Sequence, residues 1–225
     1  MNSRTLKELA GGVVLGAGLT ACLYPSYLRE RCLNWGATPV EIWRGMPGAE
    51  FLLHAPLVST RVVSIAAPPS AIWPWLVQMG PGRGGAYTYD WIENLLRLKM
   101  HSANEILPEF QDLKAGDTLP LGLAGLPIHV EILDPEQSMV LRSEDGNWVW
   151  EFGLYPEGDG VTRLVSRNRI AYPGRKLPYR AFVMYVMEPG SLVMERKMLL
   201  GIKARSERLA RDHRVGPGTA TANGA

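Results

Sequence analysis

Cysteine, histidine and net charge are all scarce in this chain, and each shortage excludes a class of protein. The 225 residues include two cysteines, Cys22 and Cys32, and four histidines. Their spacing matches no zinc-binding pattern, so we expect no metal, and two thiols give no disulfide framework. The formal charge is only +2, and no basic run alternates with aromatic residues, so we expect no nucleic-acid partner.

Internal repeats, long linkers and nucleotide-binding motifs are also missing. A glycine-rich loop spans residues 80–85, but no Lys-Ser/Thr pair follows it and it lies between two predicted helices, so it does not match a phosphate-binding loop. We therefore expect no cofactor. The length corresponds to about one to one and a half domains. This favours one domain over residues 35–212, an N-terminal segment over 1–34 and a disordered tail over 213–225.

The N-terminal segment contains an uncharged run from Leu9 to Leu28, between Glu8 and Arg29. Its length is close to the ~20 residues that a helix needs to cross a bilayer. One interpretation is an uncleaved membrane anchor, and a second is a lipoprotein signal in which Cys22 is acylated. A glycine-rich helix packed on the domain, or a poorly ordered leader, is the third. We expect membrane association through this segment, with a cytoplasmic protein as the alternative.

The central part of the sequence predicts a strand, two short helices and an antiparallel meander. Alternation over Val58–Ile65 predicts the first strand, which Pro68 and Pro69 end. Ser70 and Asp90 then mark the starts of two helices on either side of the glycine-rich loop. Turn residues separate the later strands, which are predicted at Thr118–Leu121, Ile128–Leu133, Met139–Ser143, Asn147–Tyr155 and Val161–Ala171.

Two of these strands carry distinctive side chains. Trp148, Trp150, Phe152 and Leu154 share one face of their strand, and we expect this aromatic row to point into the space that the sheet encloses. Arg163, Arg167 and Arg169 share a face of the last strand. A row of charges on a half-buried strand predicts a solvated face, and an anion site inside a cavity is the alternative.

The C-terminal part predicts one long helix from Ser191 to about Asp212. Glu195 lies within its apolar stripe, which is formed by Leu192, Leu199, Ile202 and Leu209. A carboxylate in an apolar stripe must be paired or lie near water. Glu195 is therefore either an ion-pair partner of a strand arginine or a group that faces a ligand.

Two motifs resemble those of one family. APPSAIWPWLVQMGPGRGGAYTYDWIEN at Ala67–Asn94 and MERKMLLGIK at Met194–Lys203 are similar to segments of bacterial members of the SRPBCC superfamily, the START-like proteins. The resemblance covers roughly residues 35–210. It implies an α+β helix-grip fold, in which an antiparallel β-sheet wraps around a long C-terminal α-helix and two short helices follow the first strand.

The resemblance implies binding, and in one version transport, of a hydrophobic small molecule or lipid in a deep cavity between sheet and helix. Its motifs suggest that polar residues at the cavity orient the ligand head group, namely Gln78, Arg83, Tyr87 and Glu195. Large side chains with a polar tip are further candidates for the lining. The remaining ligand-binding candidates are Tyr89, Trp91, His129 and Trp150.

Two other functions stay open from the sequence. The superfamily includes polyketide cyclase-like and dehydratase-like enzymes, and such chemistry needs a positioned acid or base in an enclosed pocket. The groups that could serve are Asp90, Glu93, His129 and Glu195, and no motif specifies a reaction. The third function is that of a non-catalytic scaffold whose cavity is vestigial.

Overall fold

A six-stranded antiparallel sheet forms the body of the protein. The computed structural model describes residues 24–95, 100–119, 127–171 and 177–215. The strand order is β1-β6-β5-β4-β3-β2, so the first and last strands of the chain are neighbours. The bounds are β1 (Leu57–Ile65), β2 (Thr118–Leu119), β3 (Ile128–Asp134), β4 (Ser138–Ser143), β5 (Trp148–Gly158) and β6 (Val161–Ile170).

Short helices precede and follow β1, and one long helix ends the described chain. Those before β1 are η1 (Tyr24–Leu28), α2 (Arg29–Leu33), α3 (Pro39–Trp43) and η2 (Ala49–Leu52). Between β1 and β2 lie α4 (Pro69–Val77), α5 (Asp90–Leu95) and η3 (Pro108–Phe110). After β6 come α6 (Leu177–Phe182), η5 (Val183–Met187) and α7 (Glu188–Val215).

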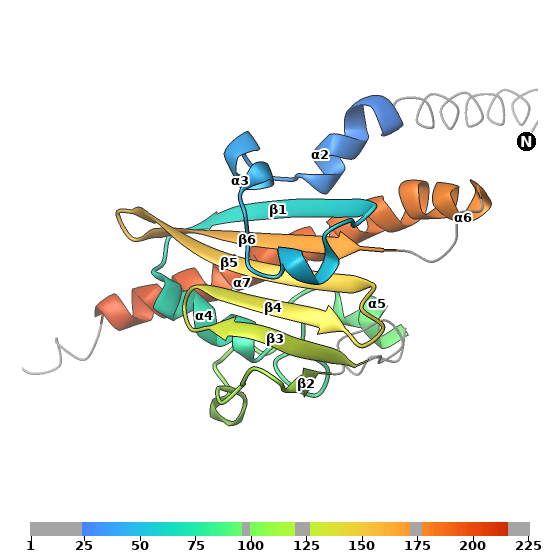
Figure 1. Ribbon diagram of the computed structural model, residues 1–225. Helices are drawn as coiled ribbons and strands as arrows, with labels where there is room; N and C mark the ends of the chain where they lie inside the picture. The colour runs from blue at the N-terminus through green and yellow to red at the C-terminus, as the bar shows by residue number, and fades with distance from the viewer. Residues whose placement is uncertain (1–23, 96–99, 120–126, 172–176, 216–225) are drawn as a thin grey trace, which may run out of the picture.

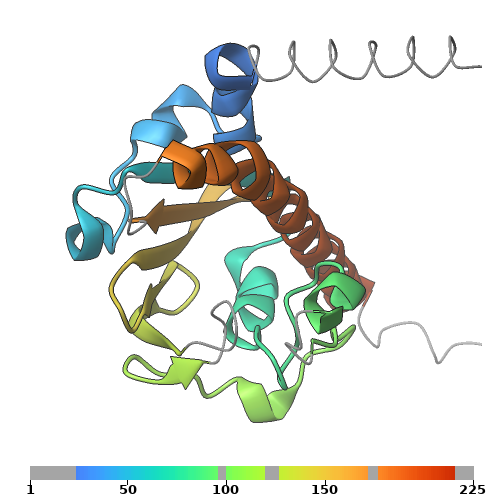
Figure 2. The same cartoon turned by 90° about the vertical axis from the view of Figure 1, so that its right-hand side faces the viewer.

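The sheet curves around α7, which crosses its concave side together with α4 (Figures 1 and 2). Strand alternation decides which side chains meet these helices. Val63 and Ile65 of β1, and Phe152 and Leu154 of β5, point inward and pack in the same core as Leu199 of α7. The α+β helix-grip arrangement, with two short helices after the first strand and a long C-terminal helix, is confirmed.

The opposite face of the sheet is covered by the segment between Trp35 and Leu52. Thr38 and Glu41 form a capping box at the start of α3, and the Glu41 carboxylate also accepts hydrogen bonds from Arg163 of β6 at 2.7 and 2.8 Å. Arg167 of β6 is 2% exposed and donates to the carbonyls of Glu41, Ile42 and Arg44. The prediction that these strand arginines face solvent is therefore wrong. The segment between Trp35 and Leu52 covers Arg163 and Arg167, whose donors bind its carbonyls and the Glu41 carboxylate.

Residues 24–34, within the predicted N-terminal segment, pack on the domain beside η5. Tyr24, Cys32 and Leu33 are buried. The carboxylate of Glu188 is 1% exposed and accepts two hydrogen bonds from Arg29, both at 2.8 Å. The rest of the predicted anchor or signal, including Cys22, lies outside the described residues. Within the described ranges, no helix is both long enough and apolar enough to cross a bilayer.

Candidate functional site

A buried group of polar side chains lies between the inner face of the sheet and α7. Arg61 of β1 is paired with Ser166 of β6 in the strand register, so the two side chains point the same way. Asn168 lies two residues further along β6 on that face. Glu195 of α7 contacts all three. It forms an ion pair with Arg61 and accepts hydrogen bonds from Ser166 at 2.6 Å and from Asn168 at 3.2 Å. We call these four residues the polar cluster.

Arg61 joins three elements through its guanidinium group, which is 1% exposed. Besides the Glu195 pair, its Nε donates to the carbonyl oxygen of Cys32 at 3.2 Å and its Nη2 donates to Ser191 Oγ at 2.9 Å. A guanidinium whose donors are used in this way is tolerated in a core, because each lost contact with water is replaced. The polar cluster therefore ties β1, α2 and α7 together.

The protonation of Glu195 is set by opposing effects. Burial raises the pKa of its carboxyl group above the ordinary value, while the charge of Arg61 and the hydrogen bonds from Ser166 and Asn168 act in the opposite direction. Both carboxylate oxygens are engaged, since Oε1 accepts from Ser166 and Oε2 meets Arg61. The carboxylate is thus surrounded by donors that belong to the protein.

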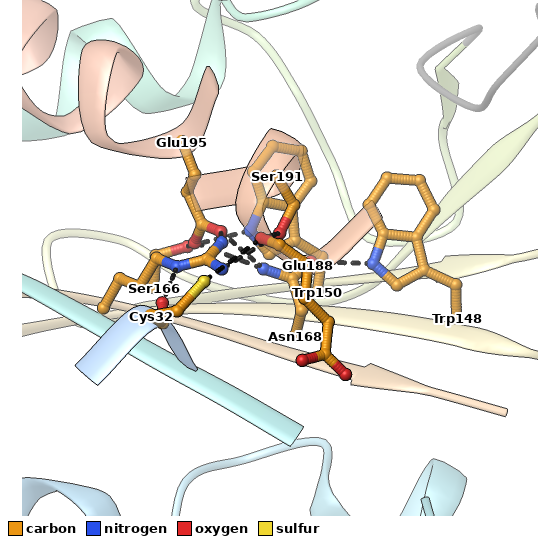
Figure 3. Close-up of polar contacts among 9 residues, drawn as sticks. Cys32, Trp148, Trp150, Ser166, Asn168, Glu188, Ser191 and Glu195 are labelled. Carbon is orange, nitrogen blue, oxygen red and sulfur yellow. Dashed lines mark hydrogen bonds and ion pairs between the residues drawn. The ribbon is translucent and has the colours of Figure 1, made fainter. Parts of the chain in front are cut away.

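Two indole rings extend the polar cluster along β5 (Figure 3). Trp150 Nε1 donates to Ser166 Oγ at 2.9 Å, and Trp148 Nε1 donates to Asn168 Oδ1 at 2.8 Å. The rings stack on each other with centroids 5.5 Å apart and an angle of 21° between planes. Both side chains are only partly buried although they point inward. Their N–H groups donate to side chains of β6, so the part of each indole that remains available for contact is its ring surface.

Gln78 and Arg83, predicted to meet the ligand head group, hold loops together. Gln78 is fully buried, accepts from the backbone N–H of Leu107 at 3.0 Å, and donates to the carbonyl of Glu105 at 3.2 Å. Arg83 donates to the carbonyl of Phe110 at 3.1 Å, and its guanidinium lies 4.6 Å from the centre of that ring. These contacts fix the segment before β2 onto the end of α4.

Tyr87 packs against α4 and α7. Its ring is 1% exposed and its hydroxyl donates to the carbonyl of Trp75 at 3.0 Å. Burial raises the pKa of this phenol well above its usual range. On the other side, Arg205 of α7 lies 4.8 Å from the ring centre. Of the four predicted head-group residues, Glu195 alone belongs to the polar cluster, where it forms an ion pair with Arg61 of β1.

The other candidates lie in three different environments. Tyr89 is partly exposed beneath Lys197 of α7, whose Nζ is 5.7 Å from the ring centre. Trp91 is 70% exposed on α5. His129 lies on the face of β3 opposite Ile128, a core residue, and its Nδ1 is 3.0 Å from Thr118 Oγ1. Strand alternation therefore turns His129 away from α7.

Of the remaining candidate acids, Asp90 has partners within the protein. Asp90 accepts from the backbone N–H and the hydroxyl of Ser102 at 2.9 and 2.5 Å, which ties α5 to the segment after it. The side chain of Glu93 lies outside what the structure describes. Within the described parts of the chain, no three His, Cys, Asp or Glu side chains are grouped to hold a metal ion.

A separate open hollow of about 480 Å³ lies on α3 and is lined by Pro39, Val40, Trp43 and Arg44. Trp43 is 86% exposed there. Because α3 covers the outer face of the sheet, this hollow is on the other side of the sheet from the polar cluster. Trp43 is therefore an exposed tryptophan that can serve as a control for Trp148 and Trp150.

Sequence reasoning missed three of the four members of the polar cluster, namely Arg61, Ser166 and Asn168. Arg61 had a usable signal, since it alternates with Val63 and Ile65 on the inward face of its strand. A lone positive charge on one apolar face and a lone negative charge on another favour each other as partners. Ser166 and Asn168 had no such signal, because small polar residues are common on either face of a strand.

The chain matches no protein-family model and no curated protein. Similar solved structures include the Polyketide_cyc-like protein Cgl2372 from Corynebacterium glutamicum, with 14% identity and a TM-score of 0.43 over 72% of this chain and 97% of that one. The KanY protein has 13% identity and a TM-score of 0.45 over 67% and 97%. The Aha1 dimer from Colwellia psychrerythraea has 13% identity and a TM-score of 0.36 over 67% and 96%. At these identities the likeness concerns the fold alone.

Proposed function

We propose that the protein binds a hydrophobic small molecule or lipid on the inner face of its sheet, against Trp148 and Trp150. The observation that carries the proposal is the state of these two indoles. They point inward, stack on one another and remain partly exposed, while their N–H groups are used by Ser166 and Asn168. A ligand would therefore meet flat apolar ring surface.

Locked indole planes favour binding because they lose little freedom when a ligand arrives. Trp150 has a hydrogen bond at its polar edge and Phe152 against its ring, with centroids 4.8 Å apart. Preorganised aromatic side chains contribute contact area at low entropic cost. The polar cluster holds this ring surface in place, because Ser166 is hydrogen-bonded to both Trp150 and Glu195.

The surface suits an apolar ligand better than a charged one. The carboxylate of Glu195 and the guanidinium of Arg61 already satisfy each other and bind protein groups. A charged head group would have to displace one of these contacts, and breaking a buried pair costs about 3–5 kcal/mol. Stacking against an exposed ring has no such cost, so the ligand class that fits is one with a flat or flexible apolar body.

The test is equilibrium binding of a fluorescent fatty acid such as cis-parinaric acid, followed by energy transfer from tryptophan. Replacing Trp150 by Ala should weaken the affinity roughly tenfold, which corresponds to about 1.4 kcal/mol of lost contact. Trp43→Ala is the matched control, because it removes an exposed tryptophan on the other side of the sheet. Equal affinity in all three proteins would overturn the proposal, and failure of the probe to bind the unaltered protein would favour the vestigial scaffold.

An enzyme of the cyclase-like or dehydratase-like kind is the second candidate, and one observation favours it. Glu195 is a buried carboxyl group whose pKa burial raises, and Ser166 connects it to a partly exposed indole. A general acid must reach its substrate through a direct or water-mediated hydrogen bond. Product analysis with hydrophobic polyketide substrates, comparing the unaltered protein with Glu195→Gln, tests this candidate. Identical product profiles would exclude a catalytic role for this carboxyl group.

The predicted membrane attachment is part of the same proposal. The uncharged run from Leu9 leads into Tyr24–Leu28, where the chain meets the domain. Cell fractionation of the full chain should place it with membranes, and labelling with a palmitate analogue should distinguish a lipoprotein from a plain anchor. Loss of the label in Cys22→Ser would indicate acylation, whereas recovery in the soluble fraction would contradict attachment altogether.

A further inference from the structure

The helical segment before α7 is apolar on both sides. Val183 of η5 is 6% exposed and packs with Leu33 and Leu57 against the domain. On the side away from the domain, large apolar side chains are left in contact with solvent: Leu177 is 79% exposed, Phe182 is 49% exposed and Val186 is 54% exposed. A helix that is apolar all round is normally covered on all sides. Within the described part of the chain, this segment therefore has a second apolar surface that no helix or strand covers.

The exposed surface has the composition of a helix that lies in a membrane interface. Aromatic residues accompany the aliphatic ones, with Tyr179 at 41% and Tyr185 at 38% exposure, and Arg180 is exposed beside them. Tyrosine prefers the level of the lipid head groups, and a basic side chain there attracts anionic lipid. We call the exposed side chains of this segment the α6–η5 surface; they are Leu177, Tyr179, Phe182, Tyr185, Val186 and Met187.

The described end of the uncharged N-terminal run lies next to this surface. The uncharged run that starts at Leu9 reaches the domain at Tyr24, whose ring lies 5.8 Å from that of Tyr185. Tyr24 and Arg29 are both held by the Glu188 carboxylate at the start of α7. The described end of the uncharged run, Tyr24–Leu28, therefore meets the α6–η5 surface at Tyr185.

We propose that the α6–η5 surface is a docking surface for a lipid bilayer that contains anionic lipids. Its apolar side chains enter the interface while Val183 and Glu188 hold the segment on the domain. Met187 precedes Glu195 by about two turns, or roughly 12 Å along the helix, so docking brings the bilayer close to the polar cluster. The inference extends the membrane attachment proposed above and does not depend on ligand binding, because binding to vesicles is measured without any ligand.

The experiment uses the full chain with one fluorescent label on the α6–η5 surface. Val186→Cys is introduced together with Cys22→Ser and labelled with a nitrobenzoxadiazole dye, since Cys32 is buried. Ala204→Cys in the same background is the matched control, because Ala204 is exposed on α7 about 27 Å further along the helical axis. Vesicles consist of phosphatidylcholine and phosphatidylglycerol, with and without a doxyl-labelled lipid that quenches only at the bilayer.

On vesicles, the dye at 186 should gain emission several-fold and lose most of it when doxyl lipid is present, whereas the dye at 204 should change little. A dye at 186 that stays accessible to aqueous iodide on vesicles would overturn the proposal. A dye that is shielded without vesicles would also overturn it. That result would assign the surface to a second copy of the chain if the shielding depends on protein concentration, and to the chain's own N-terminal run if it does not.

Discussion

The ion pair between Arg61 and Glu195 gives the sharpest test of the polar cluster. The change is made in three proteins: Glu195→Leu, Arg61→Met and the double variant. Each single substitution leaves one charge in a core where the side chains of Arg61 and Glu195 are 1% and 8% exposed. The double variant leaves no charge and keeps a similar apolar volume.

The expected magnitude follows from this burial. Removing one partner of a buried ion pair costs about 3–5 kcal/mol, whereas replacing both by apolar residues is often neutral. For a domain of this size, 1 kcal/mol corresponds to about 2–4 °C in Tm. Each single variant should therefore melt roughly 6–20 °C lower, and the double variant should recover most of that loss.

The assay is urea unfolding followed by far-ultraviolet circular dichroism, with a double-mutant cycle for the coupling energy. Single variants that each lose less than about 1 kcal/mol, or a double variant equal to the sum of the two, would refute the reasoning. Glu195→Gln adds a separate comparison, because it keeps the shape of the side chain. A lower Tm with unchanged probe affinity would mark Glu195 as a structural partner, and an unchanged Tm with lost affinity would assign it to the ligand.

Three further predictions concern other parts of the fold. Burial raises the pKa of Glu41, but the hydrogen bonds from Arg163 and Thr38 and the charge of Arg163 together outweigh burial and lower the pKa to about 2. The stability this provides is complete above the ordinary value of 4.5 and is lost as pH falls towards 2, so Glu41→Gln should flatten that fall by up to about 3 kcal/mol in melts against pH. Gly36→Ala should cost about 2 kcal/mol or more in urea unfolding, because φ is +73° and its Cβ would lie 2.2 Å from the Val62 carbonyl oxygen; an unchanged midpoint would contradict this close approach. Tyr87→Phe should cost about 1 kcal/mol in the same assay, since a carbonyl of α4 loses its buried donor, and a stabilised variant would show that this hydrogen bond is not needed.

The sequence predicted the fold because its local patterns agree with the overall arrangement. Alternation placed the strands, and proline and glycine marked where they end, as at β1 and the β5–β6 hairpin. The covering of the outer face was not predictable in this way. Alternation shows that Arg163 and Arg167 share a face, but the chain that covers them begins more than a hundred residues earlier, near Glu41. No local sequence pattern indicates a contact between residues so far apart in the chain.

The candidate site was predictable only where a residue broke its local pattern. Glu195 lies in an apolar stripe, and this alone predicted a strand arginine or a ligand as its partner. The choice between Arg61 and other arginines required the strand register, which places Arg61 beside Ser166. Gln78 and Arg83 were chosen from a motif, and the structure gives them contacts that hold loops together. Their role towards a ligand stays a prediction.

The hydrogen bonds on the inner face of the sheet favour ligand binding over catalysis there. Catalysis by Glu195 would need a free position on its carboxylate, yet Arg61, Ser166 and Asn168 donate to it from β1 and β6. Binding needs no free polar group, only rigid apolar area next to solvent, and Trp150 provides it because Ser166 holds its N–H. Ser166 makes two hydrogen bonds with different effects. It donates to the Glu195 carboxylate, which limits the access of a substrate to that group, and it accepts from Trp150, which fixes the indole ring for binding. Ser166→Ala removes both hydrogen bonds while Arg61 and Asn168 still donate to the carboxylate, so we expect a lower probe affinity and no new product. New product formation would instead show that Ser166 blocks a catalytic carboxyl group.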